Sequence, residues 1–363
     1  MNKTPVAVIG AGPAGLSCAL EVLDNGGNVV ILDENAEPGG QLFKQIHKFF
    51  GSQDHQAGTR GIEIGKKLLN QLEKKQARVL LGAVVYGIFD NKRIGYIKDG
   101  KEFLLEADHI VVATGASENP LAFPGSTLPG VMGAGAAQTL INIHRVLPGE
   151  KVLMVGSGNV GLIVSYQLIQ AGARVVAIVE AAPKIGGYGV HAAKLSRAGV
   201  PFYTRHTIKK LTGTEQIESA IVAALDQEGS FIPESEIYFD VDTVCISVGL
   251  SPLTELLWIC GCDFIFIPEV GGHVPKHDLN MQTNIQGLYV AGDVTGIEEA
   301  SSAMEEGRLA GIACAEKLGL ICPEKAFLKK QEIWKRLKQL RDGPFGKQRY
   351  QAKTFQTVDD WSR

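Results

Sequence analysis

Three glycines in a Gly-x-Gly-x-x-Gly pattern follow an apolar run near the start of the chain. Residues 6–9 lead directly into Gly10, Gly12 and Gly15. Glycine permits a sharp turn at the first position, close approach of the backbone to a pyrophosphate at the second, and tight helix–strand packing at the third. Free N–H groups at the start of the next helix also attract phosphate. The pattern therefore predicts a strand, a tight turn and a helix that bind a dinucleotide.

An acidic residue follows at the distance that such a ligand requires. The apolar run at 29–32 ends in Asp33, roughly twenty residues beyond the glycines. A carboxylate in that place accepts hydrogen bonds from ribose hydroxyl groups. We therefore assign Asp33 to the ligand rather than to a solvated strand end.

The same order of features recurs in the middle of the chain. Apolar residues 152–155 lead into Gly156, Gly158 and Gly161, and the next apolar strand ends in Glu180. This internal repeat predicts a second dinucleotide site. A carboxylate there suits the free 2′-hydroxyl of NAD and repels the 2′-phosphate of NADP, so NAD is favoured.

Three other apolar runs end where ligands of open α/β sheets bind. They end at Thr114–Gly115, at Gly249 and at Gly292–Asp293. A helix expected from about residue 299 or 300 would direct its N-terminus at a developing anion. The alternative for Asp293 is an ordinary strand, loop and capped helix.

The remaining pattern predicts the elements that position these residues. We expect a helix at about 61–75, a small antiparallel region at about 78–111 and another region of short strands at about 201–245. The length of 363 residues suits about two domains, and the net charge of −3 gives no reason to expect nucleic acid as a partner.

Two sequence features limit the location and the chemistry. No apolar stretch approaches the roughly 20 residues that cross a bilayer, and the N-terminus has no signal-peptide pattern, so we expect a cytoplasmic protein without a membrane partner. The six cysteines include no Cys-x-x-Cys pair, and we expect no metal site. Cys260 and Cys262 are interpreted as buried structural thiols.

Residues 321–363 differ from the rest, with eleven Lys or Arg against five Asp or Glu. Residues 324–341 have a helical composition, and aromatic side chains are interleaved with the charges, namely Trp334, Phe345, Tyr350, Phe355 and Trp361. The segment is either a solvated tail or one that docks onto a partner or onto the rest of the chain.

Over residues 5–318, these motifs resemble the two-dinucleotide-binding-domain flavoproteins that include thioredoxin reductase. The resemblance implies an α/β fold with two Rossmann-like, three-layer domains in a thioredoxin-reductase-like arrangement, each with a small antiparallel β insert. It implies an FAD-binding domain at 1–117 and 247–320 and an NAD(P)-binding domain at 118–246. Residues 321–363 would be a separate basic, aromatic tail.

The resemblance also implies the cofactors and the residues that contact them. FAD would contact Gly10, Gly12, Pro13, Ala14, Gly15, Asp33, Glu34, Gly40, Gln41, Leu42, Val84, Thr114, Gly115, Gly292, Asp293, Glu299 and Ala300. NAD would contact Gly156, Gly158, Asn159, Val160, Glu180 and Gly249. No catalytic side chain is assigned, because the cofactors carry hydride transfer. Glu298 and Glu299 would oppose a reduced, anionic flavin, and we expect them to turn away from it.

One departure from the thioredoxin reductase pattern narrows the range of activities that the resemblance implies. The segment 129–140, where that enzyme carries its redox dithiol, has no cysteine, which excludes thiol–disulfide exchange. This segment, together with 186–194 and 249–252, is more similar to the nucleotide-binding subunits of hydrogen cyanide synthase, opine oxidase and sarcosine or proline dehydrogenases.

That similarity implies an electron-handling subunit of an oligomeric amino acid or amine dehydrogenase. Its partners would be a second flavoprotein subunit, an iron–sulfur protein or both. Two alternatives stay open: a stand-alone NAD(P)H:acceptor reductase of the ferredoxin type, and a nucleotide-binding subunit without redox activity.

Overall fold

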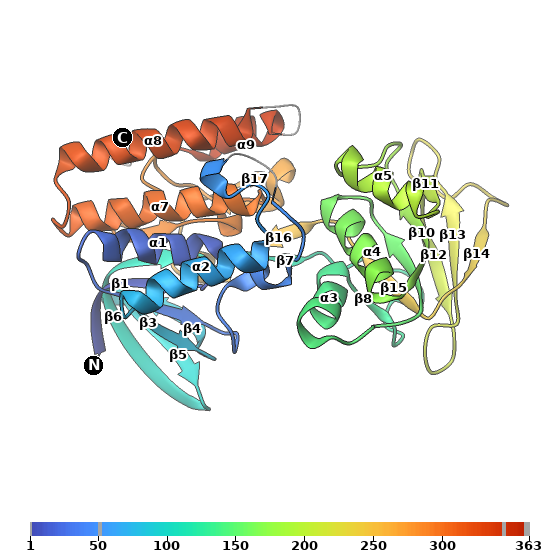
Figure 1. The fold of residues 1–363 in the computed structure, drawn as a ribbon, viewed down its shortest axis with the longest axis horizontal. Helices are drawn as coiled ribbons and strands as arrows, with labels where there is room; N and C mark the ends of the chain where they lie inside the picture. Colours follow the sequence, from blue (N-terminus) through green and yellow to red (C-terminus); the bar gives the residue numbers. More distant parts are fainter. Residues whose placement is uncertain (1, 50–52, 343–345, 359–363) are drawn as a thin grey trace. The chain divides into compact units, whose positions relative to one another are not determined.

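The computed structural model describes residues 2–49, 53–342 and 346–358, which fall into two compact units (Figure 1). The first unit comprises Met1–Ser117 and Ser251–Arg363, and the second comprises Glu118–Leu250. The segment that we expected as a separate tail, 321–363, is grouped with the first unit. Two short strands, β7 (Ala116–Glu118) and β16 (Leu250–Pro252), pair where the chain passes between the units.

A seven-stranded sheet forms the centre of the first unit, in the order β3-β2-β1-β6-β5-β4, and β19 pairs with β6. Its strands are β1 (Asn2–Ile9), β2 (Val29–Asp33), β3 (Arg78–Leu81), β4 (Val84–Phe89), β5 (Arg93–Lys98), β6 (Lys101–Val112) and β19 (Leu288–Val290). Every residue of β2 is buried, which is typical of a parallel strand covered on both faces.

The antiparallel strands of this unit continue the main sheet. β4 pairs antiparallel with β5, and β5 with the first half of β6, whose second half pairs in parallel with β1. Residues 78–81 were expected within the antiparallel region, but β3 pairs in parallel with β2. A four-residue strand carries no local signal for the direction of its partner.

Helices cover this sheet, and α7 lies between α1 and α8 (Figure 1). The helices of this unit are α1 (Pro13–Asp24), α2 (Gly61–Lys74), α6 (Glu255–Ile259), α7 (Ala300–Lys317), α8 (Pro323–Arg341) and α9 (Lys347–Gln356), and a two-stranded sheet contains β17 (Phe264–Ile267) and β18 (Gly272–Pro275). A Cβ atom on Gly307 of α7 would lie 2.1 Å from the carbonyl oxygen of Ala14. Glycine at 307 therefore lets α7 contact the backbone of α1.

The basic segment after residue 320 packs against the first unit. Ala326, Ile333 and Leu337 of α8 are buried in the apolar core that α1 and α7 share, and Ala352 of α9 packs with Val270. The alternative of a solvated tail is therefore wrong. Phe345 and Trp361 lie outside the described residues.

The second unit has its own parallel sheet, in the order β11-β10-β9-β15-β8. Its strands are β8 (Val131–Gly133), β9 (Lys151–Val155), β10 (Arg174–Glu180), β11 (Phe202–Thr204) and β15 (Thr243–Ile246), and its α-helices are α3 (Ala134–Thr139), α4 (Asn159–Ala171) and α5 (Gly189–Arg197). Antiparallel strands β12 (His206–Thr212), β13 (Ser219–Ala224) and β14 (Ile237–Asp240) form a separate sheet. The predicted α/β fold with antiparallel inserts is confirmed.

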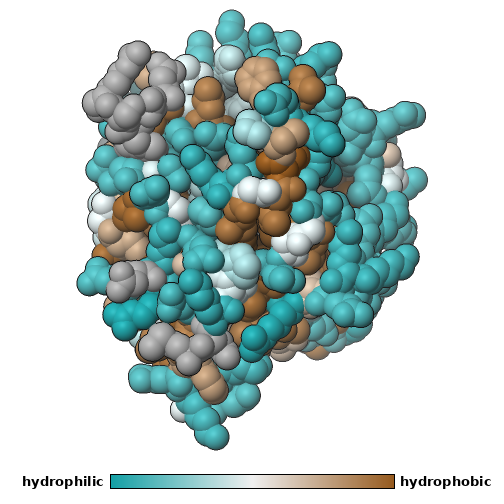
Figure 2. Space-filling model, turned by 90° about the vertical axis from the view of Figure 1, so that its left-hand side faces the viewer, coloured by the Kyte–Doolittle hydropathy of each residue, from teal (hydrophilic) through white to brown (hydrophobic). Residues whose placement is uncertain are grey.

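On the face seen in Figure 2, hydrophilic side chains surround smaller groups of apolar ones. Several apolar residues of the C-terminal helices stay exposed, among them Phe327, Leu328 and Phe355. None of the described helices is long and apolar enough to span a membrane.

Candidate functional site

The first glycine turn joins β1 to α1 with almost no free space on its inner side. A Cβ atom on Gly10, which has a φ of +107°, would lie 2.2 Å from the carbonyl oxygen of Ala113, and one on Gly15 would lie 1.9 Å from that of Gly10. No atom lies within 4 Å of a Cβ built on Gly12. Helix α1 begins at Pro13, so its first N–H groups lie beside open space at Gly12.

Asp33 is tied to this turn. Its Oδ2 accepts a hydrogen bond of 2.6 Å from the N–H of Ala11, and its Oδ1 accepts from the backbone and side chain of Asn35, both at 2.8 Å. The neighbouring Glu34 is exposed. The acid at the end of β2 therefore fixes the glycine turn as well as marking the expected ribose position.

The segment after residue 38 contacts the same turn. The N–H of Gly39 donates to the carbonyl oxygen of Ala11 at 2.8 Å, and a Cβ on Gly40 would lie 2.9 Å from the Cα of Gly12. Gln41 is exposed at this place, whereas Leu42 is fully buried. The Leu42 side chain therefore anchors the segment in the core.

Three more predicted residues lie near strand ends of this sheet. Thr114 follows β6, and its hydroxyl donates to the carbonyl oxygen of Leu253 at 2.7 Å. Gly115 follows it with a φ of +77°. Val84 begins β4 and is 45% exposed. The N–H of the residue before it donates to the carbonyl oxygen of Asp33.

The segment between β19 and α7 brings an acidic side chain to the first glycine turn. A Cβ on Gly292 would lie 2.8 Å from the Cβ of Ala14, so the segment contacts the first turn of α1. Asp293 follows, and its Oδ1 accepts from the N–H of Glu298 at 3.3 Å. Desolvation raises the pKa of Asp293 to about 7, and the nearby Glu306 adds to this rise.

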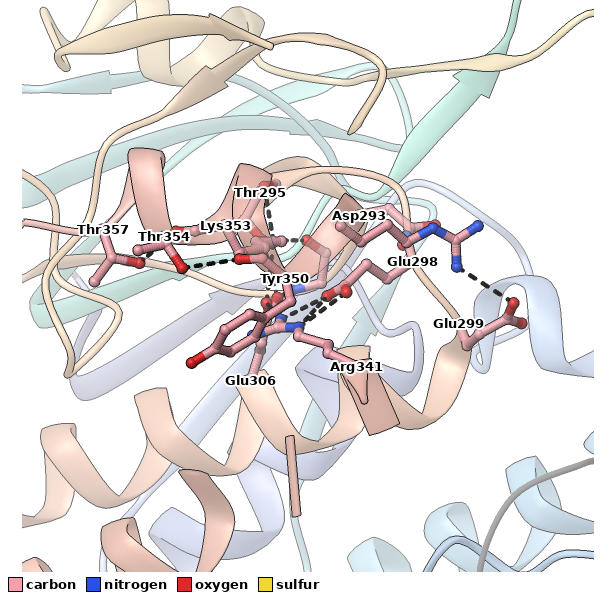
Figure 3. A network of polar contacts seen from close by, with 12 residues as sticks. Asp293, Thr295, Glu298, Glu299, Glu306, Arg341, Tyr350, Lys353, Thr354 and Thr357 are labelled. Atoms are coloured by element: carbon pink, nitrogen blue, oxygen red, sulfur yellow. Dashed lines mark hydrogen bonds and ion pairs between the residues drawn. The ribbon is translucent and has the colours of Figure 1, made fainter. Parts of the chain in front are cut away.

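The two glutamates before α7 form ion pairs with the C-terminal helices (Figure 3). Glu298 pairs with Arg341 at 2.5 Å, and Glu299, the residue before the first helical residue Ala300, pairs with Arg349 at 3.5 Å. We expected both side chains to turn away from the flavin, and their cationic partners were not foreseen.

Because the pKa of Asp293 is raised, we expect the free energy of unfolding to fall as the pH rises. In protein without a bound ligand, the folded state holds this proton up to about pH 7, whereas the unfolded chain releases it near pH 4. The variant Asp293→Asn keeps an uncharged side chain at every pH. We expect its free energy of unfolding to exceed that of the wild type by about 1–3 kcal/mol at pH 8 and by much less at pH 4.

Urea unfolding at several pH values measures this difference. The exposed Asp90→Asn is the control and should show no such trend. A difference for Asp293→Asn that is the same at pH 4 and pH 8 would contradict the assignment.

The second unit repeats the geometry of the first turn. A Cβ on Gly156 would lie 2.0 Å from the carbonyl oxygen of Ser247, one on Gly161 would lie 2.4 Å from that of Gly156, and one on Gly158 would meet no atom within 4 Å. The Oε2 of Glu180 accepts from both the N–H and the hydroxyl of Ser157, at 2.9 and 2.6 Å. Glu180 in β10 thus occupies the place that Asp33 has in β2.

A loop after β10 lies against the second turn. The N–H of Gly186 donates to the hydroxyl of Ser157 at 3.0 Å, and the N–H of Tyr188 donates to the Oδ1 of Asn159 at 2.8 Å. Asn159 therefore holds this loop, a role that the sequence analysis missed. The adjacent glycines at 186 and 187 are the sequence signal for such a close approach.

The last two predicted NAD residues also lie in this unit. Val160, in the first turn of α4, is 37% exposed. Gly249 has a φ of +117° and lies beyond β15, and its carbonyl oxygen accepts from the N–H of Asn119 at 3.0 Å. Both positions are compatible with ligand contact.

The pyridine nucleotide-disulphide oxidoreductase family matches residues 4–307 of this chain. The chain belongs to this family. Its membership, predicted from the two glycine turns and the two later strand ends, is confirmed.

Curated relatives of this chain include proteins that are named as enzyme subunits. An opine oxidase subunit from Rhizobium meliloti is 29% identical over 87% of this chain and 63% of its own length. Hydrogen cyanide synthase subunit HcnB of Pseudomonas aeruginosa is 26% identical over 99% of this chain and 81% of its own length. The chain thus spans less than two thirds of that opine oxidase protein.

Solved structures with the same fold include two named enzymes. L-proline dehydrogenase from P. horikoshii has a TM-score of 0.69 at 22% identity and covers 92% of this chain and 59% of its own. Thioredoxin reductase from T. acidophilum has a TM-score of 0.71 at 20% identity and covers 88% of this chain and 99% of its own.

The close pair of cysteines in this chain is poorly suited to thiol chemistry. Burial raises the pKa of Cys260 to about 11 and that of Cys262 to about 12. The thiolate is the reactive form in disulfide exchange, so neither side chain supplies it at neutral pH.

Proposed function

We propose that this protein is an FAD-dependent oxidoreductase that transfers hydride between NAD(H) and the flavin. The observation that carries the proposal is the geometry repeated in the two units. In each unit, an acidic residue at the end of a strand accepts a hydrogen bond from the residue between the first two glycines, Ala11 at 2.6 Å and Ser157 at 2.9 Å. Two such turns in one chain suit two dinucleotides.

The first unit fits FAD. The open space over Gly12 admits a pyrophosphate beside the N-terminus of α1, and Asp33 lies where the adenosine ribose would be. Gly40 and Gln41 would lie beside the flavin, and Asp293 would hydrogen-bond to the ribityl chain. Bound FAD accepts a hydride and carries a negative charge once reduced.

The chain's own contribution to this chemistry is electrostatic. The N-terminus of α7, at Ala300, has no side-chain cap among the described residues and would offer its first N–H groups and a partial positive charge to the reduced flavin. Glu298 and Glu299 would weaken that effect if they were free, but both are paired with arginine.

NAD rather than NADP is proposed for the second unit, because Glu180 would accept hydrogen bonds from a 2′-hydroxyl and repel a 2′-phosphate. We expect Glu180→Gln to lower kcat/KM for NADH by about tenfold and to change that for NADPH much less. Steady-state rates with a dye acceptor give both values, and Glu215→Gln, an exposed acid of the same unit, is the control. A wild-type protein that uses NADPH as well as NADH would contradict the preference.

We further propose that the protein is the electron-handling subunit of a heteromeric amino acid or amine dehydrogenase. Support comes from the relatives, which are named as subunits of opine oxidase and hydrogen cyanide synthase. The partner would be a second flavoprotein subunit, an iron–sulfur protein or both, in an oligomeric, cytoplasmic complex. Exposed apolar residues of α8 and α9, such as Phe327 and Phe355, are available for such contacts.

The alternative of a stand-alone ferredoxin-type reductase relied on a free basic tail to attract an acidic protein. The structure weakens that argument, because Arg341 and Lys353 of this segment are buried in ion pairs. The alternative of a nucleotide-binding subunit without redox activity is tested by the colour of the purified protein.

Anaerobic addition of NADH to the purified protein tests the proposal. We expect a yellow protein whose flavin absorbance is bleached by stoichiometric NADH, and a second flavoprotein or iron–sulfur protein that copurifies from the native source. A colourless protein that binds adenine nucleotides would overturn the redox function. If NADH bleaches the flavin absorbance but no second flavoprotein or iron–sulfur protein copurifies, the heteromeric role would be overturned.

A further inference from the structure

Two buried carboxylates belong to residues that hydrogen-bond to the segment carrying Asp293, which is proposed to contact the flavin. The side chains of Glu298 and Glu306 are 5% and 3% exposed. Burial of uncompensated negative charge is costly, and it would oppose further negative charge nearby. Their neutralisation is therefore a requirement of this site.

The C-terminal helices supply the neutralising cations (Figure 3). Arg341, at the end of α8, contacts Glu298 at 2.5 and 2.9 Å and Glu306 at 2.7 Å. Lys353 in α9 contacts Glu306 at 3.0 Å. Both cations are 5% exposed, and both follow residue 307, where the family match ends.

The same contacts hold the backbone on both sides of Asp293. The other carboxylate oxygen of Glu306 accepts from the N–H of Gly292 at 3.0 Å and from the hydroxyl of Thr295 at 2.9 Å, and Lys353 donates to the carbonyl oxygen of Thr295 at 2.8 Å. The N–H of Glu298 donates to Asp293 itself. The network therefore fixes the charge and the position of the segment together.

The pKa values agree with paired, ionised side chains. Burial alone would raise the pKa of Glu306, but the Lys353 and Arg341 cations lower it well below its ordinary value. Burial lowers the pKa of the adjacent His277 to about 4, and Lys353 adds to this, so the histidine adds no positive charge at neutral pH. Arg341 and Lys353 thus provide the positive charge that balances the two glutamates.

We propose that Arg341 and Lys353 act on the flavin indirectly, as positioning residues. They cancel the negative charges of Glu298 and Glu306, and this makes the flavin easier to reduce. The inference rests on the FAD site proposed above. Neither cation needs to contact the cofactor, because at low dielectric a charge acts over several ångströms. The C-terminal segment is therefore part of the redox site as well as part of the fold.

The test is the midpoint potential of the bound flavin in the full-length protein, measured by equilibration with a reference dye. Arg341→Gln and Lys353→Met should each weaken the binding of reduced FAD relative to oxidised FAD by about tenfold. For a two-electron couple, this corresponds to a potential about 30 mV more negative. Glu298→Gln should shift the potential in the opposite direction.

Arg336→Gln is the matched control. Arg336 also lies on α8 and also pairs with a buried glutamate of α7, Glu305, through contacts of 3.0 and 2.8 Å. Glu305 also pairs with His55 and Arg308, and within the described residues its hydrogen bonds and ion pairs go to these side chains and not to the segment around Asp293. A loss of helix packing would affect this variant as well, whereas the proposed effect leaves its potential unchanged.

Charge restoration separates electrostatics from packing. Arg341→Lys and the double variant Arg341→Gln with Glu298→Gln should both return the potential toward that of the wild type. If Arg341→Gln does not fold, the shifts of Lys353→Met and Glu298→Gln decide the matter. Unchanged potentials in variants that hold FAD and are bleached by NADH would overturn the inference alone, whereas a wild type without FAD would overturn the proposed function.

Discussion

Replacement of Gly12 by valine is expected to give a folded protein without bound flavin. Gly12 has a φ of −79° and a ψ of −175°, an extended conformation that any residue adopts, and a Cβ there meets no protein atom within 4 Å. The valine side chain would instead fill the space through which the pyrophosphate approaches the N-terminus of α1. Flavin content per chain measures the loss of the cofactor, and thermal unfolding shows whether the variant is folded.

The second glycine turn offers the matched control. Gly158 has the same extended backbone and the same open space, so Gly158→Val should also fold. We expect this variant to keep its flavin but to lose bleaching by NADH, whereas dithionite should still reduce it. Stoichiometric flavin in Gly12→Val, or colourless Gly158→Val, would show that the assignment of cofactors to turns is wrong.

Leu337→Ala in α8 is expected to destabilise the first unit by about 2–5 kcal/mol. The Leu337 side chain is fully buried in the core that α1 and α7 also form, so its truncation leaves a cavity. Leu328→Ala is the matched control, because this leucine of the same helix is 60% exposed and should cost under about 0.5 kcal/mol. Urea unfolding followed by circular dichroism measures both values.

The buried side chains of the C-terminal segment also determine what its deletion should do. Deletion of residues 321–363 would remove Ile333 and Leu337 from the core that α1 and α7 share, and would take Arg341 and Lys353 away from Glu298 and Glu306. We therefore expect the truncated chain to be unfolded or insoluble, and a loss of activity would not measure recruitment of a partner. A soluble deletion variant as stable as the full chain would contradict the packing described.

Local patterns in the sequence were enough to predict the two glycine turns and the acidic residues that follow them. The steric limits of Gly10 and Gly156 act over a few residues, and an acid at the end of the next strand is part of the same local unit. The fold class and the family follow from those repeated units. That Glu298 turns away from the flavin, expected on charge alone, stays a prediction.

Only the tertiary structure decided where the C-terminal segment lies and which acidic side chains it pairs with. Arg341 is 43 residues from Glu298 in the chain, so no local pattern links the two charges, and the apolar positions of α8 predict a helix without specifying what covers it. The pairing of β3 and the loop that engages Asn159 were missed for the same reason. The sequence by itself determined the turns that suit two dinucleotides, because glycine sterics are local. The tertiary structure decided which charges surround them, because burial and ion pairing depend on residues that only the fold brings together.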